Sequence, residues 1–585
     1  MRKSRLRAFA GLMLGAAALL PTNLAICAAA TGRYDRPNVV MIVLDDVGFS
    51  DLGAFGSEIR TPNIDALAAD GLRYNRFDTK AVCSPTRAAL LTGRNPQTVR
   101  MADLPATTVD RSDNTRDRGE LPNNAQTIGQ VLQRAGYTTH GLGKWHLAPE
   151  DEDGTPGRNA SWPLQRGFDS FYGFFSGWTD QYHPKLIEGN RAVPSPETAG
   201  YHFSADITDR AIAAFTPKGP APRKPAFLYL AYGAGHAPIQ VPGQYSSAYA
   251  GVYDKGWDTL REQRLAREIQ LGIVPANTSL PARNPGDRAW ADLSPTERKV
   301  FARFMQVYAG FLTHTDEQIG RLVAHLKATG QYENTVFILL SDNGAASEAG
   351  QTGSFEQLYR PSKLTIEQML QRIDDIGTDK TQSEYQRPWA MAGVTPFRRY
   401  KVWPYLGGVR TPLIITWPKV IRDHGAIRSQ YVDAVDLAPT IADLARTHFP
   451  SAVSGKGELP VAGKSIRKTL TSAAAPSTRK VQYFELRGNR AITEGKWRAV
   501  AVHRQLTDFA DDRWELYDTE TDFSETTNVA AEHPEKLAEL KALWWREARK
   551  YSTPALAEAP AKYRNRERFD DSANRSAPAE LGSPE

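Results

Sequence analysis

The sequence predicts an α/β protein with a mainly parallel sheet flanked by helices, followed by a smaller C-terminal α+β domain. From residue 36 to residue 450, apolar runs rich in β-branched residues alternate with helical patterns, which is typical of a parallel sheet. Most of these runs end in polar or glycine-rich residues. After residue 450 the runs become shorter and one long helical pattern follows. At 585 residues the chain is long enough for more than one domain.

The first 30 residues have the layout of a secretory signal peptide. Four basic residues precede the apolar run "AFAGLMLGAAALL", and the small residues 28–30 offer a cleavage site. An uncleaved anchor helix is the alternative, but Thr22 and Asn23 cut the run below the roughly 20 residues that a membrane span needs. A lipid-anchored Cys27 is a weaker alternative, because the bulky Ile26 precedes it. We therefore expect an exported protein, in a bacterial periplasm or secreted, with no membrane attachment after cleavage.

Cleavage changes how the charge and the cysteines are interpreted. The net charge of +6 loses four basic and no acidic residues, which leaves +2 and gives no support to nucleic-acid binding. Of the two cysteines, Cys27 leaves with the signal peptide, so Cys83 has no disulfide partner. An unpaired cysteine in an exported protein indicates reactivity, and a small buried apolar residue is an equally common explanation.

Polar side chains follow the predicted strands. The strand "PNVVMIVLDD" ends in Asp45 and Asp46, and "NTVFILLSDNG" ends in Asp342 and Asn343. Two more runs, "YTTHGLGKWH" and "AFLYLAYGAGH", carry Lys144, His146 and His236, and "RTPLIITWP" follows Gly407 and Gly408. Helices are predicted in "NIDALAADGL", "NAQTIGQVLQRAG" and "DEQIGRLVAHLKATG" between the strands. Ligand sites of such sheets lie at the carboxyl ends of the strands, so we expect the polar residues to converge on one rim.

The rest of the chain divides into three regions. Residues 245–298 have weak periodicity and are predicted to be an insertion near the rim. Residues 451–552 contain the strand patterns "VQYFELRG", "RAITEGKWRAVAVH" and "WELYD" and the helix "PEKLAELKALWWREARKY", which predict an antiparallel sheet with one helix. Residues 553–585 are rich in Ala, Pro and charge and are predicted to be a mobile tail.

The segment "CSPTRAALLTGR" places Cys83 at the start of a predicted helix. Pro85 suits the first helical turn, and Gly93 suits the end of the helix. The free N–H groups and the dipole at that end favour an anion, and Arg87 lies one turn further on. The segment resembles the signature of the type I sulfatases, Cys-x-Pro-x-Arg followed by Thr-Gly-Arg. The six matching positions are Cys83, Pro85, Arg87, Thr92, Gly93 and Arg94.

The resemblance extends from about Arg36 to Tyr551 and implies an alkaline-phosphatase-like fold. It implies that a formylglycine-generating enzyme oxidises Cys83 to Cα-formylglycine, whose hydrate is the nucleophile. A hydrate has two hydroxyls on one carbon. After one has attacked sulfur, loss of the proton from the other re-forms the aldehyde and expels sulfate.

The same resemblance implies further site residues. One Ca²⁺ is expected on Asp45, Asp46, Asp342 and Asn343, with Cys83 counted among the ligands, and hard oxygen donors suit that ion. By themselves the paired aspartates are equally well explained as turn formers. The resemblance gives Lys144 and Lys401 contacts with sulfate, His146 a role in orienting the nucleophile and His236 the role of general acid. These residues and Arg87 suit sulfate ester cleavage, which develops negative charge on oxygen.

The predicted substrate is a sulfate monoester of a small molecule or saccharide, and aryl sulfates are the favoured class. A phosphonate or phosphate monoester hydrolase on the same scaffold is one alternative, and an inactive binding protein for sulfated polymers is another. The family often has His-Glu-Gly-Gly where this chain has Tyr405-Leu406-Gly407-Gly408, and this departure affects the pocket beside Lys401. Trp178, Tyr182 and His183 are candidates for the pocket wall, with ordinary loop packing as an equal alternative.

Overall fold

The structure is a computed structural model that describes residues 36–105, 119–149, 159–216, 224–453, 456–504 and 507–551. The predicted signal peptide and the predicted tail lie outside the described residues. Within the described part of the chain, no helix combines the length and the apolar character that crossing a membrane requires.

A sheet of ten strands forms the centre of the protein, in the order β11-β2-β10-β9-β1-β8-β4-β5-β6-β7. Its middle strands, from β9 to β5, are all parallel, whereas β10 runs antiparallel to β9 and β6 runs antiparallel to β5. The strands are β1 Asn38–Leu44, β2 Leu72–Tyr74, β4 Thr138–Lys144, β5 Ser170–Phe174, β6 Leu186–Glu188, β7 Arg191–Val193, β8 Ala226–Ala231, β9 Thr335–Ser341, β10 Leu413–Thr416 and β11 Ala426–Arg428. The predicted mainly parallel sheet is confirmed.

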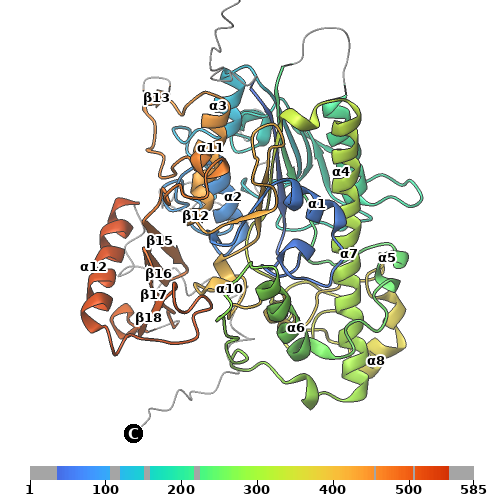
Figure 1. The fold of residues 1–585 in the computed structure, drawn as a ribbon. Helices are drawn as coiled ribbons and strands as arrows, with labels where there is room; N and C mark the ends of the chain where they lie inside the picture. Colours follow the sequence, from blue (N-terminus) through green and yellow to red (C-terminus); the bar gives the residue numbers. More distant parts are fainter. Residues whose placement is uncertain are drawn as a thin grey trace, which may run out of the picture. The chain divides into compact units, whose positions relative to one another are not determined.

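Helices cover both faces of this sheet (Figure 1). Alternate residues of β1 divide between the two layers: Val40 and Ile42 belong to one apolar cluster, and Val39 and Met41 belong to the other. The first layer contains α1, α4 and α7, and the second contains α2, α3 and α11. Their bounds are α1 Pro62–Asp70, α2 Cys83–Thr92, α3 Ile128–Arg134, α4 Phe203–Phe215, α7 Pro295–Ala328 and α11 Leu437–Leu444.

Helix α7 is longer than its sequence pattern predicted. It has 34 residues and starts at a capping box in which Ser294 and Glu297 each bond the other's backbone N–H. Residues 307–312 are all buried, so no polar face marks this stretch as helical. The predicted insertion also contains helix, namely α5 Gly243–Ser247 and α6 Gly256–Gln270. The further short helices are α8 Ile366–Gln371, α9 Arg387–Gly393 and α10 Leu406–Val409.

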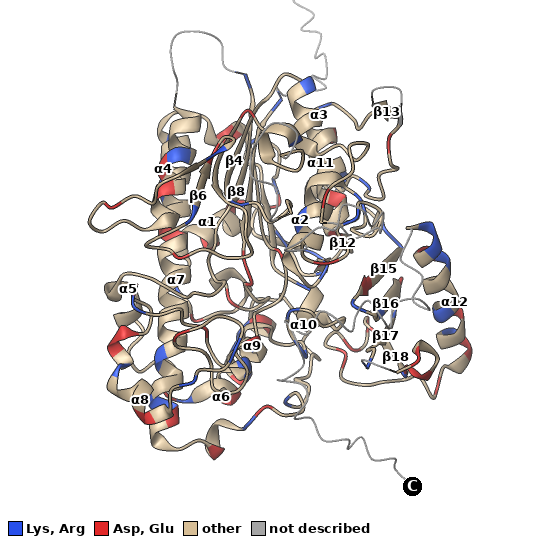
Figure 2. Ribbon diagram, turned by 180° about the vertical axis from the view of Figure 1, so that it is seen from behind, with Lys and Arg blue, Asp and Glu red and all other residues tan. Residues whose placement is uncertain are grey.

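The C-terminal part forms the predicted antiparallel sheet, in the order β15-β16-β17-β18, with one helix against it. Its elements are β15 Val481–Leu486, β16 Asn489–Glu494, β17 Trp497–Ala501, β18 Trp514–Asp518 and α12 Pro534–Lys550. Two short pairs complete the strands: β3 Phe77–Asp78 with β12 Val432–Asp433, and β13 Ala452–Val453 with β14 Lys456–Gly457. The ribbon of α12 carries both basic and acidic positions in Figure 2.

Candidate active site

Four acidic or amide side chains meet at the carboxyl ends of β1 and β9. Leu44 pairs with Ser341 in the parallel register, so the next residues of both strands lie side by side. The backbone N–H of Asp342 donates to Leu44 (3.1 Å), that of Asp46 donates to the Asp342 carboxylate (3.3 Å), and the Asn343 amide donates to Asp46 (2.6 Å). Asp45 and these three residues are fully buried.

Cys83 faces this cluster from the first residue of α2. The helix ends as predicted, with Gly93 in the left-handed conformation (φ 66°). Donor atoms of Asp45, Cys83 and Asp342 lie within 4.8 Å of one another. Burial raises the pKa of the Cys83 thiol to about 11, so at neutral pH the residue is a thiol.

Arg87 lies one turn along α2 and is fully buried. Its Nη2 is 2.7 Å from Asp342 and 3.5 Å from Asp45, and its Nη1 donates to the Lys144 carbonyl and the Tyr229 hydroxyl. Burial alone would lower the pKa of Arg87, but Asp342 raises it, and the guanidinium stays charged. Arg87 therefore holds the aspartates in position beside Cys83.

Each of the two lysines binds a different aspartate. Lys144, the last residue of β4, donates to both Asp45 oxygens (2.9 and 2.7 Å). Lys401 lies 2.8 Å from Asp46 and 2.8 Å from Glu348. Burial alone would lower the pKa of Lys401, but the Asp46 and Glu348 carboxylates hold it well above its ordinary value. Both lysines therefore place positive charge beside the cluster.

The two histidines lie on loops that follow β4 and β8. His146 has a positive φ of 53°, and its Nδ1 has no hydrogen-bond partner in the described part of the chain. His236 Nδ1 is 2.6 Å from the Ala237 carbonyl, which can only accept, so Nδ1 carries the proton of the neutral ring. Its Nε2 faces the Tyr359 hydroxyl at 3.3 Å and Asp46 at 3.6 Å. Burial lowers the pKa of His236 to about 3 and that of His146 well below its ordinary value.

The donor set fits a hard cation. Burial raises the pKa of Asp45 to about 8, and the neighbouring Asp342 adds to this effect while Lys144 opposes it. The Oδ1 atom of Asn343 is buried and has no hydrogen-bond partner among the described residues. Carboxylate and amide oxygens of this kind are the ligands that Ca²⁺ prefers.

Three further side chains at this site were not found from the sequence. Glu348 binds Lys401, the Tyr359 hydroxyl faces His236, and the Tyr229 hydroxyl accepts a hydrogen bond from Arg87. Tyr229 lies within a strand and Glu348 and Tyr359 lie on an irregular loop. Glu348 is only five residues beyond Asn343, which is the one signal in the sequence that could have pointed to it.

The last signature residue, Arg94, has structural contacts. It donates to the backbone carbonyls of Thr92, Gln126 and Leu459 and binds Glu458 at 2.8 Å. Arg94 therefore ties the end of α2 to the chain around residue 458. The structure places it in this junction and not among the residues around Cys83.

Tyr405 and Leu406 stand where the family often has His-Glu, and both bond to the C-terminal part of the chain. The Tyr405 hydroxyl donates to Glu515 (3.0 Å), and the Leu406 N–H donates to Glu525 (2.8 Å). Gly407 lies against the loop that follows β9, because a Cβ atom on Gly344 would lie only 1.9 Å from the Gly407 carbonyl oxygen. Tyr405 and Leu406 therefore contribute contacts between the main sheet's part of the chain and the C-terminal part.

The predicted pocket-wall residues lie on a loop that begins beside His146, and they are only partly covered. Trp178 and Tyr182 are half-buried, and His183 is exposed. A Cβ atom on Gly177, next to Trp178, would lie 3.1 Å from the His146 ring. This loop therefore borders the site.

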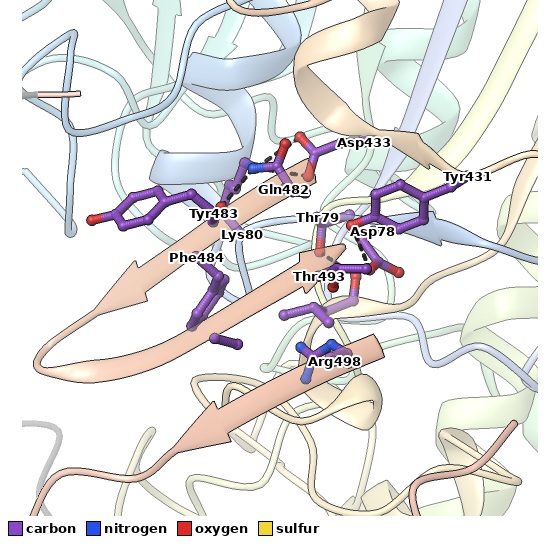
Figure 3. Close-up of a pocket in the computed structure, with 12 residues that line it drawn as sticks. Asp78, Thr79, Lys80, Tyr431, Asp433, Gln482, Tyr483, Phe484, Thr493 and Arg498 are labelled. Carbon is purple, nitrogen blue, oxygen red and sulfur yellow. Dashed lines mark hydrogen bonds and ion pairs between the residues drawn. The ribbon is translucent and has the colours of Figure 1, made fainter. Parts of the chain in front are cut away.

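A small cavity that Cys83 does not line lies between the C-terminal sheet and the segment 78–80 (Figure 3). Its charged groups pair with one another: Lys80 binds Asp433 at 2.7 Å, and the Tyr431 hydroxyl donates to Asp78 at 3.0 Å. The described residues that line it include no cysteine or histidine. We interpret it as a gap in the polar interface between the C-terminal sheet and the rest of the chain.

Two family models match the chain. The sulfatase model matches residues 37–447, and a model described as the C-terminal part of N-sulphoglucosamine sulphohydrolase matches residues 399–550.

The chain is 32% identical to an uncharacterized sulfatase of Schizosaccharomyces pombe, over 87% of this chain and 93% of the relative. It is 30% identical to an arylsulfatase of Klebsiella aerogenes (79% and 96% covered). It is 26% identical to an N-acetylgalactosamine-6-sulfatase of Rattus norvegicus (76% and 68% covered).

Solved structures share the fold at lower identity. The crystal structure of Ps i-CgsB superposes with a TM-score of 0.61 at 24% identity, covering 88% of this chain and 93% of that one. A phosphonate monoester hydrolase of Silicibacter pomeroyi superposes with a TM-score of 0.52 at 21% identity, covering 88% and 96%. At these identities the likeness supports the fold alone.

Proposed function

The chain belongs to the sulfatase family, and on this premise we propose that it hydrolyses sulfate monoesters, aryl sulfates first, to a phenol or alcohol and inorganic sulfate. The observation that carries the proposal is the meeting of Cys83, at the start of α2, with Asp45 and Asp342 at the ends of two strands. This arrangement places a modifiable side chain, carboxylates and three cations in one buried space.

We propose that position 83 acts as Cα-formylglycine, produced from the cysteine by a formylglycine-generating enzyme. The buried thiol with its raised pKa is a poor nucleophile at neutral pH, which agrees with a need for conversion. The unpaired state of Cys83 and the complete signature around it support the same proposal.

One Ca²⁺ would be held by Asp45, Asp46, Asp342 and Asn343, with an oxygen at position 83. When bound, the ion supplies positive charge that stabilises the sulfate oxygens. The unpartnered Asn343 oxygen supports this ligand set.

The chain's own cations then have separate roles. Lys144 and Lys401 bind sulfate oxygens, and Arg87 holds Asp342 and Asp45 beside position 83. His146 orients the nucleophile, because its ring lies on the loop directly after Lys144 and its backbone carbonyl accepts from Ser84 (2.7 Å). His236 can take up a second proton on Nε2, the ring nitrogen that faces the site, when the negative charge of the bound sulfate ester raises its pKa, and it then delivers that proton to the departing oxygen.

The export and domain predictions remain part of this proposal. We propose that residues 1–30 direct the chain out of the cytoplasm. The converting enzyme would act on the chain during this export. Residues 36–450 would form the catalytic part and residues 451–552 the smaller C-terminal part.

The test is a substrate panel on full-length protein from a host that has the converting enzyme, loaded with calcium. Mass spectrometry of the peptide around position 83 should show an aldehyde in place of the thiol. Sulfate monoesters of nitrophenol and of monosaccharides should be hydrolysed, whereas Cys83→Ala should be inactive with unchanged circular dichroism. Full activity of a protein that keeps its thiol would overturn the proposed nucleophile.

A phosphonate monoester hydrolase is the second candidate, because one such enzyme shares the fold. Aryl phosphonate and aryl sulfate esters are therefore compared in the same panel. A kcat/KM that is higher on the phosphonate would favour the second candidate. An inactive binding protein is disfavoured, because all six signature positions are present.

A further inference from the structure

Tyr359 has an unusual backbone conformation beside His236. It lies on the irregular loop between β9 and α8, and its φ angle is 59°. This region is disfavoured for a bulky L-residue, because the side chain crowds the backbone. Residues in such conformations persist only where their surroundings fix them, and they are frequent at functional sites. Tyr359 is therefore a candidate for a role other than loop formation.

Contacts with a second segment fix the loop that carries Tyr359. The backbones of Ser354 and Glu384 exchange two hydrogen bonds, of 2.8 and 2.9 Å. The buried carboxyl group of Glu384 also accepts from the backbone N–H groups of Ala349 and Tyr359, each at 3.1 Å. These contacts hold the backbone of Tyr359 in place, and its hydroxyl group takes no part in them.

His236 presents one ring nitrogen to this hydroxyl. The backbone N–H of His236 donates to the Gly233 carbonyl (3.1 Å), and Nδ1 donates to the Ala237 carbonyl (2.6 Å). The Tyr359 hydroxyl lies 3.3 Å from Nε2, and the two rings meet edge to face with their centres 5.8 Å apart. Because Nε2 of the neutral ring can only accept, Tyr359 is the donor of this hydrogen bond.

The hydroxyl therefore lies where the departing oxygen must arrive, since the proposed general acid reaches that oxygen from Nε2. Tyr359 is half-buried, whereas His236 is 3% exposed and Asp46 is 0% exposed. The departing oxygen carries the organic part of the substrate, which has to extend from the buried cluster toward solvent. Burial raises the pKa of the Tyr359 phenol well above its ordinary value, against an opposing effect of Lys401, so the group remains a donor.

We propose that Tyr359 is a further catalytic residue, whose hydroxyl donates a hydrogen bond to the departing oxygen beside His236. The inference rests on the proposed sulfate ester hydrolysis. As the bond between sulfur and this oxygen breaks, the oxygen keeps the electron pair and takes the Nε2 proton of His236. A protonated Nε2 cannot accept from Tyr359, so the hydroxyl turns to the oxygen on which negative charge develops and keeps its own proton.

The experiment measures kcat/KM of converted, calcium-loaded full-length protein on 4-nitrophenyl, phenyl and alkyl sulfates. Tyr359→Phe removes one oxygen and keeps the ring, so the loop should stay folded. It should slow 4-nitrophenyl sulfate less than about 3-fold and the other esters about 10- to 100-fold, mainly through kcat, because their oxygens carry more charge as they depart. An equal fall of kcat/KM on all esters would make Tyr359 a structural residue and overturn the proposal.

Two further variants separate a direct contact from support of His236. If Tyr359 reaches the departing oxygen itself, Tyr359→Phe should still slow phenyl sulfate in a His236→Ala background. If Tyr359 only orients the histidine, the second change should have no effect there, which would overturn the proposal. Tyr232→Phe is the matched control, because Tyr232 also follows β8 and its hydroxyl lies 2.7 Å from that of Thr208 in α4. This control should keep the wild-type dependence on leaving-group pKa.

Binding of a product separates this inference from the proposed function. If wild-type protein hydrolyses no sulfate ester, the proposed function fails, and calorimetry with 4-nitrophenolate on calcium-loaded protein still tests Tyr359. This anion carries the oxygen that would depart, so Tyr359→Phe should weaken its binding about 10-fold, and Tyr232→Phe should not. Equal affinities of wild type and Tyr359→Phe, or no binding to either, would overturn the inference independently of turnover.

Discussion

His236 differs from the lysines of the site in what it can donate. Its Nδ1 proton is held by the Ala237 carbonyl, so Nε2 is the atom that exchanges a proton with a ligand. Lys144 and Lys401 instead present fixed positive charge beside the aspartates. The two kinds of residue should therefore respond differently to the leaving group of the substrate.

We predict that His236→Ala slows esters with poor leaving groups most, because an alkoxide needs a proton that a nitrophenolate does not. Lys401→Ala should slow all esters about equally, since it binds the sulfate that they share. The measurement is kcat/KM over aryl and alkyl sulfates of graded leaving-group pKa. Parallel plots for the two variants would show that His236 is not the general acid.

The carboxylate cluster gives a prediction about the cation. Chelation should abolish turnover, and Ca²⁺ should restore it together with a higher melting temperature, because a ligand that binds only the folded state stabilises it. Asp45→Asn should weaken the calcium-dependent shift, since it removes a hard anionic ligand. Asp316→Asn, at a buried carboxylate that bonds α1, is the control and should keep the shift. Restoration by zinc in place of calcium would contradict the ligand assignment.

At the scale of elements, a pair of histidines joins α4 and α7. His202, the N-cap of α4, has its ring centre 4.3 Å from that of His314 in α7. Burial and the neighbouring His314 lower the pKa of His202 to about 3, against a weaker opposing effect of Asp180. Burial and Arg321 lower the pKa of His314 to about 4. Both rings are therefore neutral in the folded protein at mildly acidic pH.

We predict that the free energy of unfolding falls as pH drops below the ordinary histidine pKa of 6.5. There the unfolded chain binds protons that the folded chain does not, and the slope is up to about 1.4 kcal/mol per pH unit for each histidine. Urea unfolding between pH 7 and pH 4.5 measures how the free energy of unfolding changes with pH. His202→Asn/His314→Gln should flatten the curve, and the exposed His448→Gln should not. Equal slopes for the double variant and the wild type would contradict the assignment.

The sequence predicted the elements that have regular patterns and the site residues that directly follow them. Asp45 and Asp342 could be placed together because parallel strands bring their carboxyl ends to one edge. Lys401 and His236 were found only through the family resemblance, because a single lysine or histidine has no pattern. Glu348 and Tyr359 were missed because an irregular loop owes its position to contacts between distant segments. Local sequence carries no record of those contacts.

At the scale of the whole molecule, the C-terminal sheet shares a hydrophobic core with the catalytic part. Phe484, Leu486 and Tyr517 belong to the same apolar cluster as Phe397 and Tyr405. Chain contacts join the described residues between 36 and 551 into one compact unit. Charged pairs also cross the junction, for example Arg398 with Glu515 at 3.2 Å and Arg479 with Asp436 at 2.5 Å. The sequence pattern alone predicted a small second domain packed on the first.

We therefore predict that the two parts unfold together. Calorimetry of the full-length protein should give one transition whose calorimetric and van't Hoff enthalpies agree. A fragment of residues 36–450 should fail to fold, because it would expose the apolar face that packs against the sheet and leave the buried Asp436 without Arg479, which binds it at 2.5 Å. Its circular dichroism and urea response would show the loss. Two separate transitions, or a cooperative fragment of residues 36–450, would mean that the shared core is not needed for folding of the catalytic part.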